Sequence, residues 1–189
     1  MVTHIRCIEI SRKKSCFSIK LMKKLIFVLL LLPCFSACTN IDCPLENVVT
    51  MNCGLYATET KTSMKITDTL TVSAGGAKDT ILINRATNVS TLNIPLRYAA
   101  KEDTLLLRFS NRQGQMATDT LFVQHVGTPH FESVDCPLVM FHKLGHVHWT
   151  SHALSKMPLT IDSVVVINDN VNYDNVQNIK IYLRPVASM

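Results

Sequence analysis

The residues best suited to chemistry are four histidines that lie close together in the chain: His142, His146, His148 and His152. Imidazole nitrogens bind zinc and copper, and residues two apart on a strand share one face. His146 and His148 have this spacing and are the predicted ligands if the segment binds a metal. The competing interpretation, which we favour, is a solvated strand face. Val147 and Trp149 would fill the opposite face, and no carboxylate within the segment orients an imidazole. No cofactor is therefore expected.

Cys38 carries the second chemical feature, a candidate lipid attachment site. Lys23 and Lys24 precede an apolar run over residues 25–35, and Ser36-Ala37 then precede Cys38. The run is shorter than the roughly 20 residues that span a bilayer, and this three-part order is typical of a secretory signal peptide. The segment resembles the motif of bacterial lipoproteins, although Phe35 replaces the usual leucine. Cys34 is a rival acceptor, and an ordinary signal peptide with a chance cysteine is the alternative.

These features predict three parts of the chain. Residues 1–37 form the predicted signal peptide, with Met22 as the alternative start of translation; residues 38–47 form a lipid-anchored tether, and residues 48–185 form a single β-sandwich domain. The predicted location is the cell envelope, with Cys38 anchored in the outer membrane. The periplasmic side is favoured over the surface, because residues 39–42 contain only one acidic residue.

An exported protein lies in an oxidising compartment where disulfides persist. Cys43 and Cys136 occur in the same tetrapeptide, Asp-Cys-Pro-Leu, and each is expected at the boundary of a loop and a strand. Cys53 alternates in phase with apolar neighbours, which indicates a buried thiol. We therefore predict a Cys43–Cys136 disulfide, with Cys53–Cys136 as the second choice.

The composition argues against two function classes. From Cys38 onward there are twelve Lys and Arg and thirteen Asp and Glu, so no basic surface is expected for nucleic acid. No nucleophile, zinc-protease or phosphate-loop motif occurs. A catalytic triad assembled in space from Asp119, Asp162, Ser163 and the histidines would be invisible to sequence patterns. We predict that the protein is not an enzyme, and a hydrolase is the second alternative after metal binding.

Period-two alternation of apolar residues predicts an all-β fold without a long helix. The predicted architecture is a β-sandwich of eight or nine short strands, immunoglobulin-like, with a barrel as the alternative. The apolar segments are residues 49–56, 70–72, 81–83, 92–96, 105–109, 121–123, 139–141, 164–167 and 179–183.

One dipeptide, Asp-Thr followed by Leu or Ile, recurs at Asp68, Asp79, Asp103 and Asp119. We interpret each aspartate as the end of a turn and each threonine as the start of a strand. A calcium site made of these carboxylates is the alternative, but it would require four strand starts to converge on one point.

Longer motifs point to a family. Cys43-Pro44, the segment over residues 128–136, Ile161 to Val164 and Asn178 to Tyr182 resemble small Bacteroidota lipoproteins with a domain of unknown function. The resemblance covers residues 43–184, and Pro137 departs from a small residue expected there. It implies an envelope location and a β-rich fold, with no activity to transfer. The predicted function is a non-catalytic binding or accessory module for a protein or glycan partner.

Overall fold

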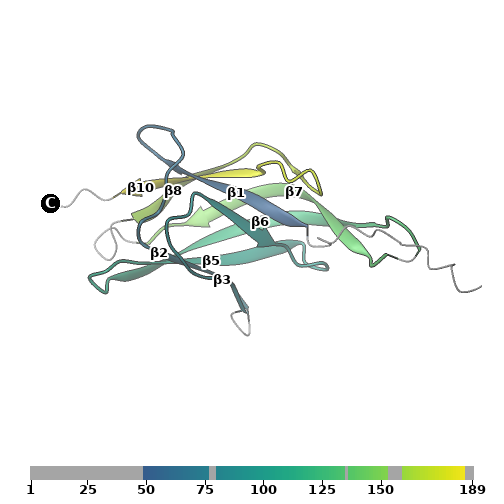
Figure 1. Ribbon diagram of the computed structural model, residues 1–189, viewed down its shortest axis with the longest axis horizontal. Helices are drawn as coiled ribbons and strands as arrows, with labels where there is room; N and C mark the ends of the chain where they lie inside the picture. The colour runs from purple at the N-terminus through teal and green to yellow at the C-terminus, as the bar shows by residue number, and fades with distance from the viewer. Residues whose placement is uncertain (1–48, 77–79, 135, 153–158, 186–189) are drawn as a thin grey trace, which may run out of the picture. The chain divides into compact units, whose positions relative to one another are not determined.

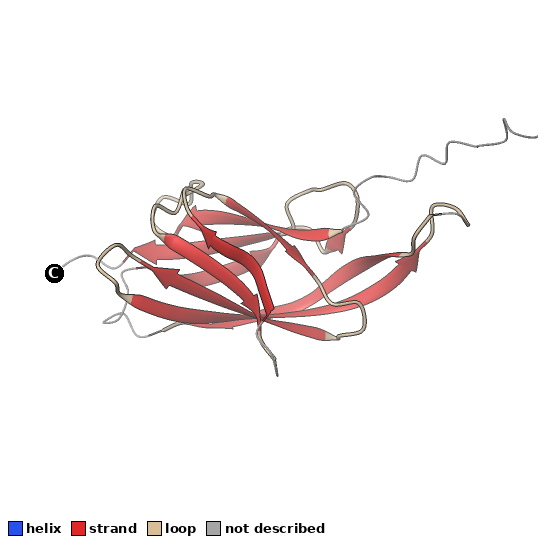
Figure 2. Cartoon of the chain, turned by 60° about the horizontal axis from the view of Figure 1, so that its bottom comes forward, coloured by secondary structure: helices blue, strands red, loops and turns tan. Residues whose placement is uncertain are grey.

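The computed structural model describes residues 49–76, 80–134, 136–152 and 159–185 (Figure 1). This part of the chain contains strands, turns and loops and no helix (Figure 2). The strands are β1 (Thr50–Ala57), β2 (Thr69–Ala74), β3 (Thr80–Ala86), β4 (Thr91–Pro95), β5 (Glu102–Ser110), β6 (Met116–His130), β7 (Val139–Thr150), β8 (Leu159–Val166), β9 (Asn170–Val171) and β10 (Ile179–Pro185).

The strands form two sheets. One sheet has four strands in the order β4-β1-β10-β8, and the other has six in the order β3-β2-β5-β6-β7-β9. All pairings are antiparallel except that of β1 with β10. Figure 1 shows β1, β8 and β10 on one side and β2, β5 and β6 on the other, in a sandwich-like arrangement.

Alternation of apolar and polar residues explains how each strand contributes to the core between the sheets. In β4, Leu92 and Ile94 are buried while Thr91, Asn93 and Pro95 are exposed. Strands β5 and β6 bury every second residue in the same way over most of their lengths. Residues from both sheets form one hydrophobic cluster, so each sheet covers the apolar face of the other.

The prediction of an all-β sandwich is confirmed. The immunoglobulin-like subtype is not confirmed, because sheets of four and six strands with a consecutive β5-β6-β7 run differ from that arrangement. The predicted strands were also too short. β6 has 15 residues and β7 has 12, so β7 extends through most of the histidine segment.

Candidate functional site

A β-bulge in the β6–β7 hairpin decides which residues of β7 face the core. One residue of β6, Gln124, is opposed by two residues of β7, Gly145 and His146. Such an extra residue reverses the alternation of side chains along the strand that contains it. Leu144 therefore faces the core before the bulge, and the odd-numbered Val147 packs against the core after it.

The bulge separates histidines that simple alternation would place on one face. His142 precedes it and is buried beside His125 of β6. His148 follows it and lies on the outer face, where its ring stacks on Phe122 with centroids 4.5 Å apart and planes 8° apart. Sequence alternation alone would have placed His142, His146 and His148 together.

The inner histidines belong to a buried chain of hydrogen-bonded groups. Asp103 Oδ2 lies 3.1 Å from His125 Nε2, and His125 Nδ1 lies 3.1 Å from His142 Nδ1. Asp103, His125 and His142 are each no more than 3% exposed. Arg97 completes the chain, because its backbone N–H donates to Asp103 Oδ2 at 2.9 Å and its guanidinium pairs with Oδ1.

The contacts determine where the protons lie. The Asp103 carboxylate accepts a hydrogen bond, so His125 donates from Nε2 and its Nδ1 carries the lone pair. His142 must then donate from Nδ1 to His125. Burial and the neighbouring His125 lower the pKa of His142, while the Asp103 carboxylate acts in the opposite direction. The lowered pKa favours the neutral form of the His142 imidazole.

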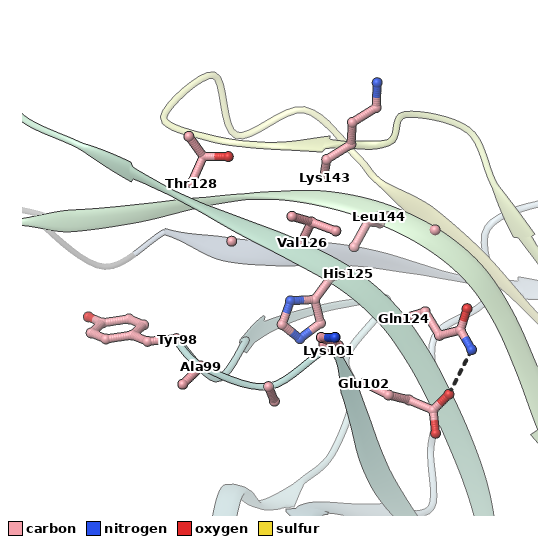
Figure 3. Close-up of a pocket in the computed structure, with 13 residues that line it drawn as sticks. Tyr98, Ala99, Lys101, Glu102, Gln124, His125, Val126, Thr128, Lys143 and Leu144 are labelled. Atoms are coloured by element: carbon pink, nitrogen blue, oxygen red, sulfur yellow. Dashed lines mark hydrogen bonds between the residues drawn. The ribbon is translucent and has the colours of Figure 1, made fainter.

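A pocket of about 960 Å³ opens over this chain of groups (Figure 3). It is lined by the loop over residues 98–102, by residues 124–128 of β6 and by residues 143–145 of β7. Tyr98 and Val126 are exposed at its walls, and Glu102 accepts a hydrogen bond from Gln124 at 3.1 Å. Figure 3 shows the His125 ring between β6 and the loop that carries Ala99. The pocket thus combines an apolar lining with polar groups, as ligand sites commonly do.

A second buried carboxylate, Asp119, is held quite differently. It accepts hydrogen bonds from the backbone N–H of His152 at 2.7 Å and of Ile161 at 2.7 Å, and from Thr160 Oγ1 at 3.0 Å. His152 Nδ1 also lies 2.6 Å from Asp119 Oδ1. Asp119 belongs to β6 and Thr160 to β8, so these bonds tie the six-stranded sheet to the four-stranded sheet.

The interpretation of the Asp-Thr dipeptides was wrong for two of the four aspartates. Asp103 is the second residue of β5 and Asp119 the fourth of β6, and both are buried rather than placed in turns. Their inward direction was detectable, because Asp103 alternates in phase with Leu105 and Asp119 with Leu121. His125 continues the same phase of β6, so its inward direction was also present in the sequence.

The predicted metal ligands, His146 and His148, do lie side by side. Their ring centroids are 5.6 Å apart, with planes inclined by 27°. Within the described part of the chain, no group of three or more His, Cys, Asp or Glu side chains is arranged to hold a metal ion. The pair is therefore brought together, while its role as a metal site stays a prediction.

The triad candidates are brought together only in part, because the described contacts join Asp119 to His152 and give Asp162 and Ser163 other partners. Asp162 of β8 pairs with Arg184 Nη2 at 3.4 Å, and the adjacent Ser163 lies opposite Tyr182 of β10. Asp119 and His152 have the geometry of an acid–base pair, but Asp119 also accepts from Thr160 and from backbone N–H groups, which is a structural role.

The predicted cysteine chemistry falls largely outside the described residues. Cys38 and Cys43 lie outside the described residues, so lipidation and the Cys43–Cys136 disulfide stay predictions. Cys53 is a free, fully buried thiol, which excludes the second-choice Cys53–Cys136 pairing in this structure. Burial raises the pKa of this thiol far above its usual range, as expected for a cysteine that only packs.

A family model fits most of the domain. Residues 69–183 match DUF6452, a family of unknown function, and the chain belongs to this family. The match begins at β2 and ends in β10, so it includes both buried carboxylates and the pocket. No curated protein and no solved structure matches the chain. The described part of the chain contains no helix long and apolar enough to cross a membrane.

Proposed function

We propose that this protein is a lipid-anchored envelope protein whose β-domain binds a partner without catalysis, at the pocket between the 98–102 loop and strands β6 and β7. The observation that carries the proposal is the pocket itself, whose volume of about 960 Å³ falls within the range of ligand sites. Its concave form favours a short polymer segment over the flat surface of a globular partner.

The lining of the pocket favours a glycan segment as the ligand. Sugar rings present apolar C–H faces and a surrounding set of hydroxyls. The exposed Tyr98 ring and Val126 offer apolar contact, and Glu102, Gln124 and Thr128 offer hydrogen-bonding groups beside them. A peptide segment of an envelope protein is the other partner that such a lining accommodates.

Binding to purified envelope polysaccharide fragments tests the pocket. Tyr98→Ala should weaken binding of the full chain about tenfold or more, because an exposed aromatic wall supplies much of the contact area. Phe131→Ala is the matched control, since Phe131 is equally exposed, at 66% against 64%, and does not line the pocket. Equal losses in both variants, or no binding by the parent protein, would contradict the glycan proposal.

The anchor requires a separate experiment. The support for it is the order of basic, apolar and small residues before Cys38, together with the resemblance to Bacteroidota lipoproteins. Cys38→Ser should abolish incorporation of a labelled fatty acid and release the protein from membranes, whereas Cys34→Ser should retain both. Fractionation of inner and outer membranes and protease accessibility in whole cells then test the proposed periplasmic side of the outer membrane.

A further inference from the structure

Two imidazole nitrogens face each other beneath the pocket at a separation suited to one metal ion. His125 Nδ1 and His142 Nδ1 are 3.1 Å apart. Two nitrogens bound to one metal at about 2.0–2.1 Å in tetrahedral geometry lie roughly 3.3 Å apart. A shift of a few tenths of an ångström therefore converts the hydrogen-bonded pair into a pair of ligands, once the proton of the neutral His142 ring moves from Nδ1 to Nε2.

The groups behind His125 have the arrangement found around metal-binding histidines. Such histidines usually donate their second nitrogen to a carboxylate, which fixes the tautomer and the ring orientation. His125 Nε2 donates to Asp103 in this way, and Arg97 in turn holds Asp103 through its backbone N–H and its guanidinium. His125 is thereby preset with its Nδ1 lone pair directed at His142.

A thioether side chain, that of Met140, lies near His142. Met140 and His142 are two residues apart on β7 and pair with Pro129 and Gly127 of β6. A side chain at Gly127 would meet the Met140 methyl at 2.8 Å, the Tyr98 carbonyl oxygen at 3.2 Å and His142 Nδ1 at 3.5 Å. Gly127 thus leaves open a space that Met140 and His142 both border, at the lining of the pocket.

We propose that His125, His142 and Met140 form a binding site for a monovalent copper ion beneath the pocket. Within the described residues no group of three His, Cys, Asp or Glu is placed to hold a metal ion here, and the completing ligand in this proposal is the sulfur of Met140, whose methyl borders the same space as His142 Nδ1. Thioether and imidazole donors together select soft Cu(I), whereas zinc sites are usually completed by a further histidine, thiolate or carboxylate. The site differs from the predicted His146 and His148 pair, which lies on the opposite face of β7.

Anaerobic titration of the purified full chain with Cu(I), in competition with a chromophoric chelator, tests the site. The parent protein should bind one copper ion tightly, and Zn(II) should bind at least a hundredfold more weakly. His142→Gln should weaken Cu(I) binding at least a hundredfold, while the His146→Gln, His148→Gln double variant should leave it within twofold. Binding that is lost only in the double variant would overturn the proposal in favour of the outer pair.

A conservative pair of variants keeps the test decisive if histidine substitutions disturb folding. Met140→Leu changes little but the sulfur and should weaken Cu(I) binding at least tenfold; Met116→Leu, at an exposed methionine outside the site, should not. Cys53→Ala checks the rival soft donor and should also leave binding unchanged. X-ray absorption should detect two nitrogen neighbours and one sulfur neighbour around copper. Unchanged affinity in Met140→Leu, or no binding tighter than micromolar in the parent protein, would overturn the site.

Discussion

Asp103 and Asp119 occur in the same Asp-Thr-Leu motif, but they differ in their hydrogen-bond partners. Each precedes threonine, each points into the core, and each is paired with a histidine. Asp119 accepts hydrogen bonds from β8 and from the segment that follows β7, so its partners come from both sheets. Asp103 accepts from Arg97 and His125, and its chain of contacts leads to His142 beside the pocket. A buried carboxylate therefore acts as a structural tie or as part of a site according to its partners.

The largest effect is expected for Asp119→Ala. Removal of this carboxylate leaves the Ile161 and His152 backbone N–H groups and the Thr160 hydroxyl without their acceptor in the core. Loss of one partner from such a buried network should lower the free energy of unfolding by about 3–5 kcal/mol. Urea denaturation measures the change, and Cu(I) affinity of the folded fraction should stay within twofold. A loss below about 1 kcal/mol would show that Asp119 does not tie the sheets together.

A smaller stability effect and a larger functional effect are expected for Asp103→Asn. The amide oxygen can still accept from His125, but the ion pair with Arg97 is lost, so the expected cost is about 1–3 kcal/mol. Copper affinity should fall about 10–100-fold, the usual consequence of altering the partner of a ligating histidine. Asp119→Asn is the matched comparison and should show the opposite balance, with stability reduced and copper affinity retained.

Gly127→Ala probes the space beneath the pocket. The added Cβ would lie 2.8 Å from the Met140 methyl, which is the end of a flexible side chain and can move. We expect a stability loss of about 1 kcal/mol and weaker copper binding, because Met140 is displaced from His142. Gly145→Ala is the control, since its Cβ would have no contact shorter than 3.6 Å. Chemical denaturation and chelator competition on both variants measure the difference, and identical behaviour would remove Gly127 from the site.

The smallest effect is expected on the outer face of β7. His148 Nδ1 is buried without a hydrogen-bond partner among the described residues, and its ring stacks on Phe122. His148→Phe keeps the stack and removes the unpaired nitrogen, so the protein should be unchanged or more stable by up to about 1 kcal/mol. Thermal denaturation measures this, with His142→Phe as the buried counterpart that should be destabilised. A marked loss of stability in His148→Phe would indicate an interaction that the outer face does not display.

The burial of the site residues could be predicted from the sequence more fully than their hydrogen-bond partners. Alternation of apolar residues places Asp103, Asp119 and His125 on inward faces, so their burial was available in the sequence. Their partners were not, because the hydrogen bonds, apart from those of Arg97, join residues separated by 17 to 42 positions in the chain. The inward direction of His142, away from the face of His148, could not be predicted from alternation. The bulge at Gly145 and His146 has no signal in the period-two pattern, and it alone separates His142 from His148.

The sequence by itself determined the all-β class, the core positions of most strands and the burial of Cys53. These properties depend on a period of two residues, which is local and leaves its trace in the order of side chains. The tertiary structure decided the strand order, the register of β6 against β7, and hence which histidines meet. Register depends on the fit of two whole strands and on one extra residue, and that free energy is distributed over contacts between distant parts of the chain. The DUF6452 domain therefore has a fold predictable from its sequence and a candidate site that only the folded hairpin brings together.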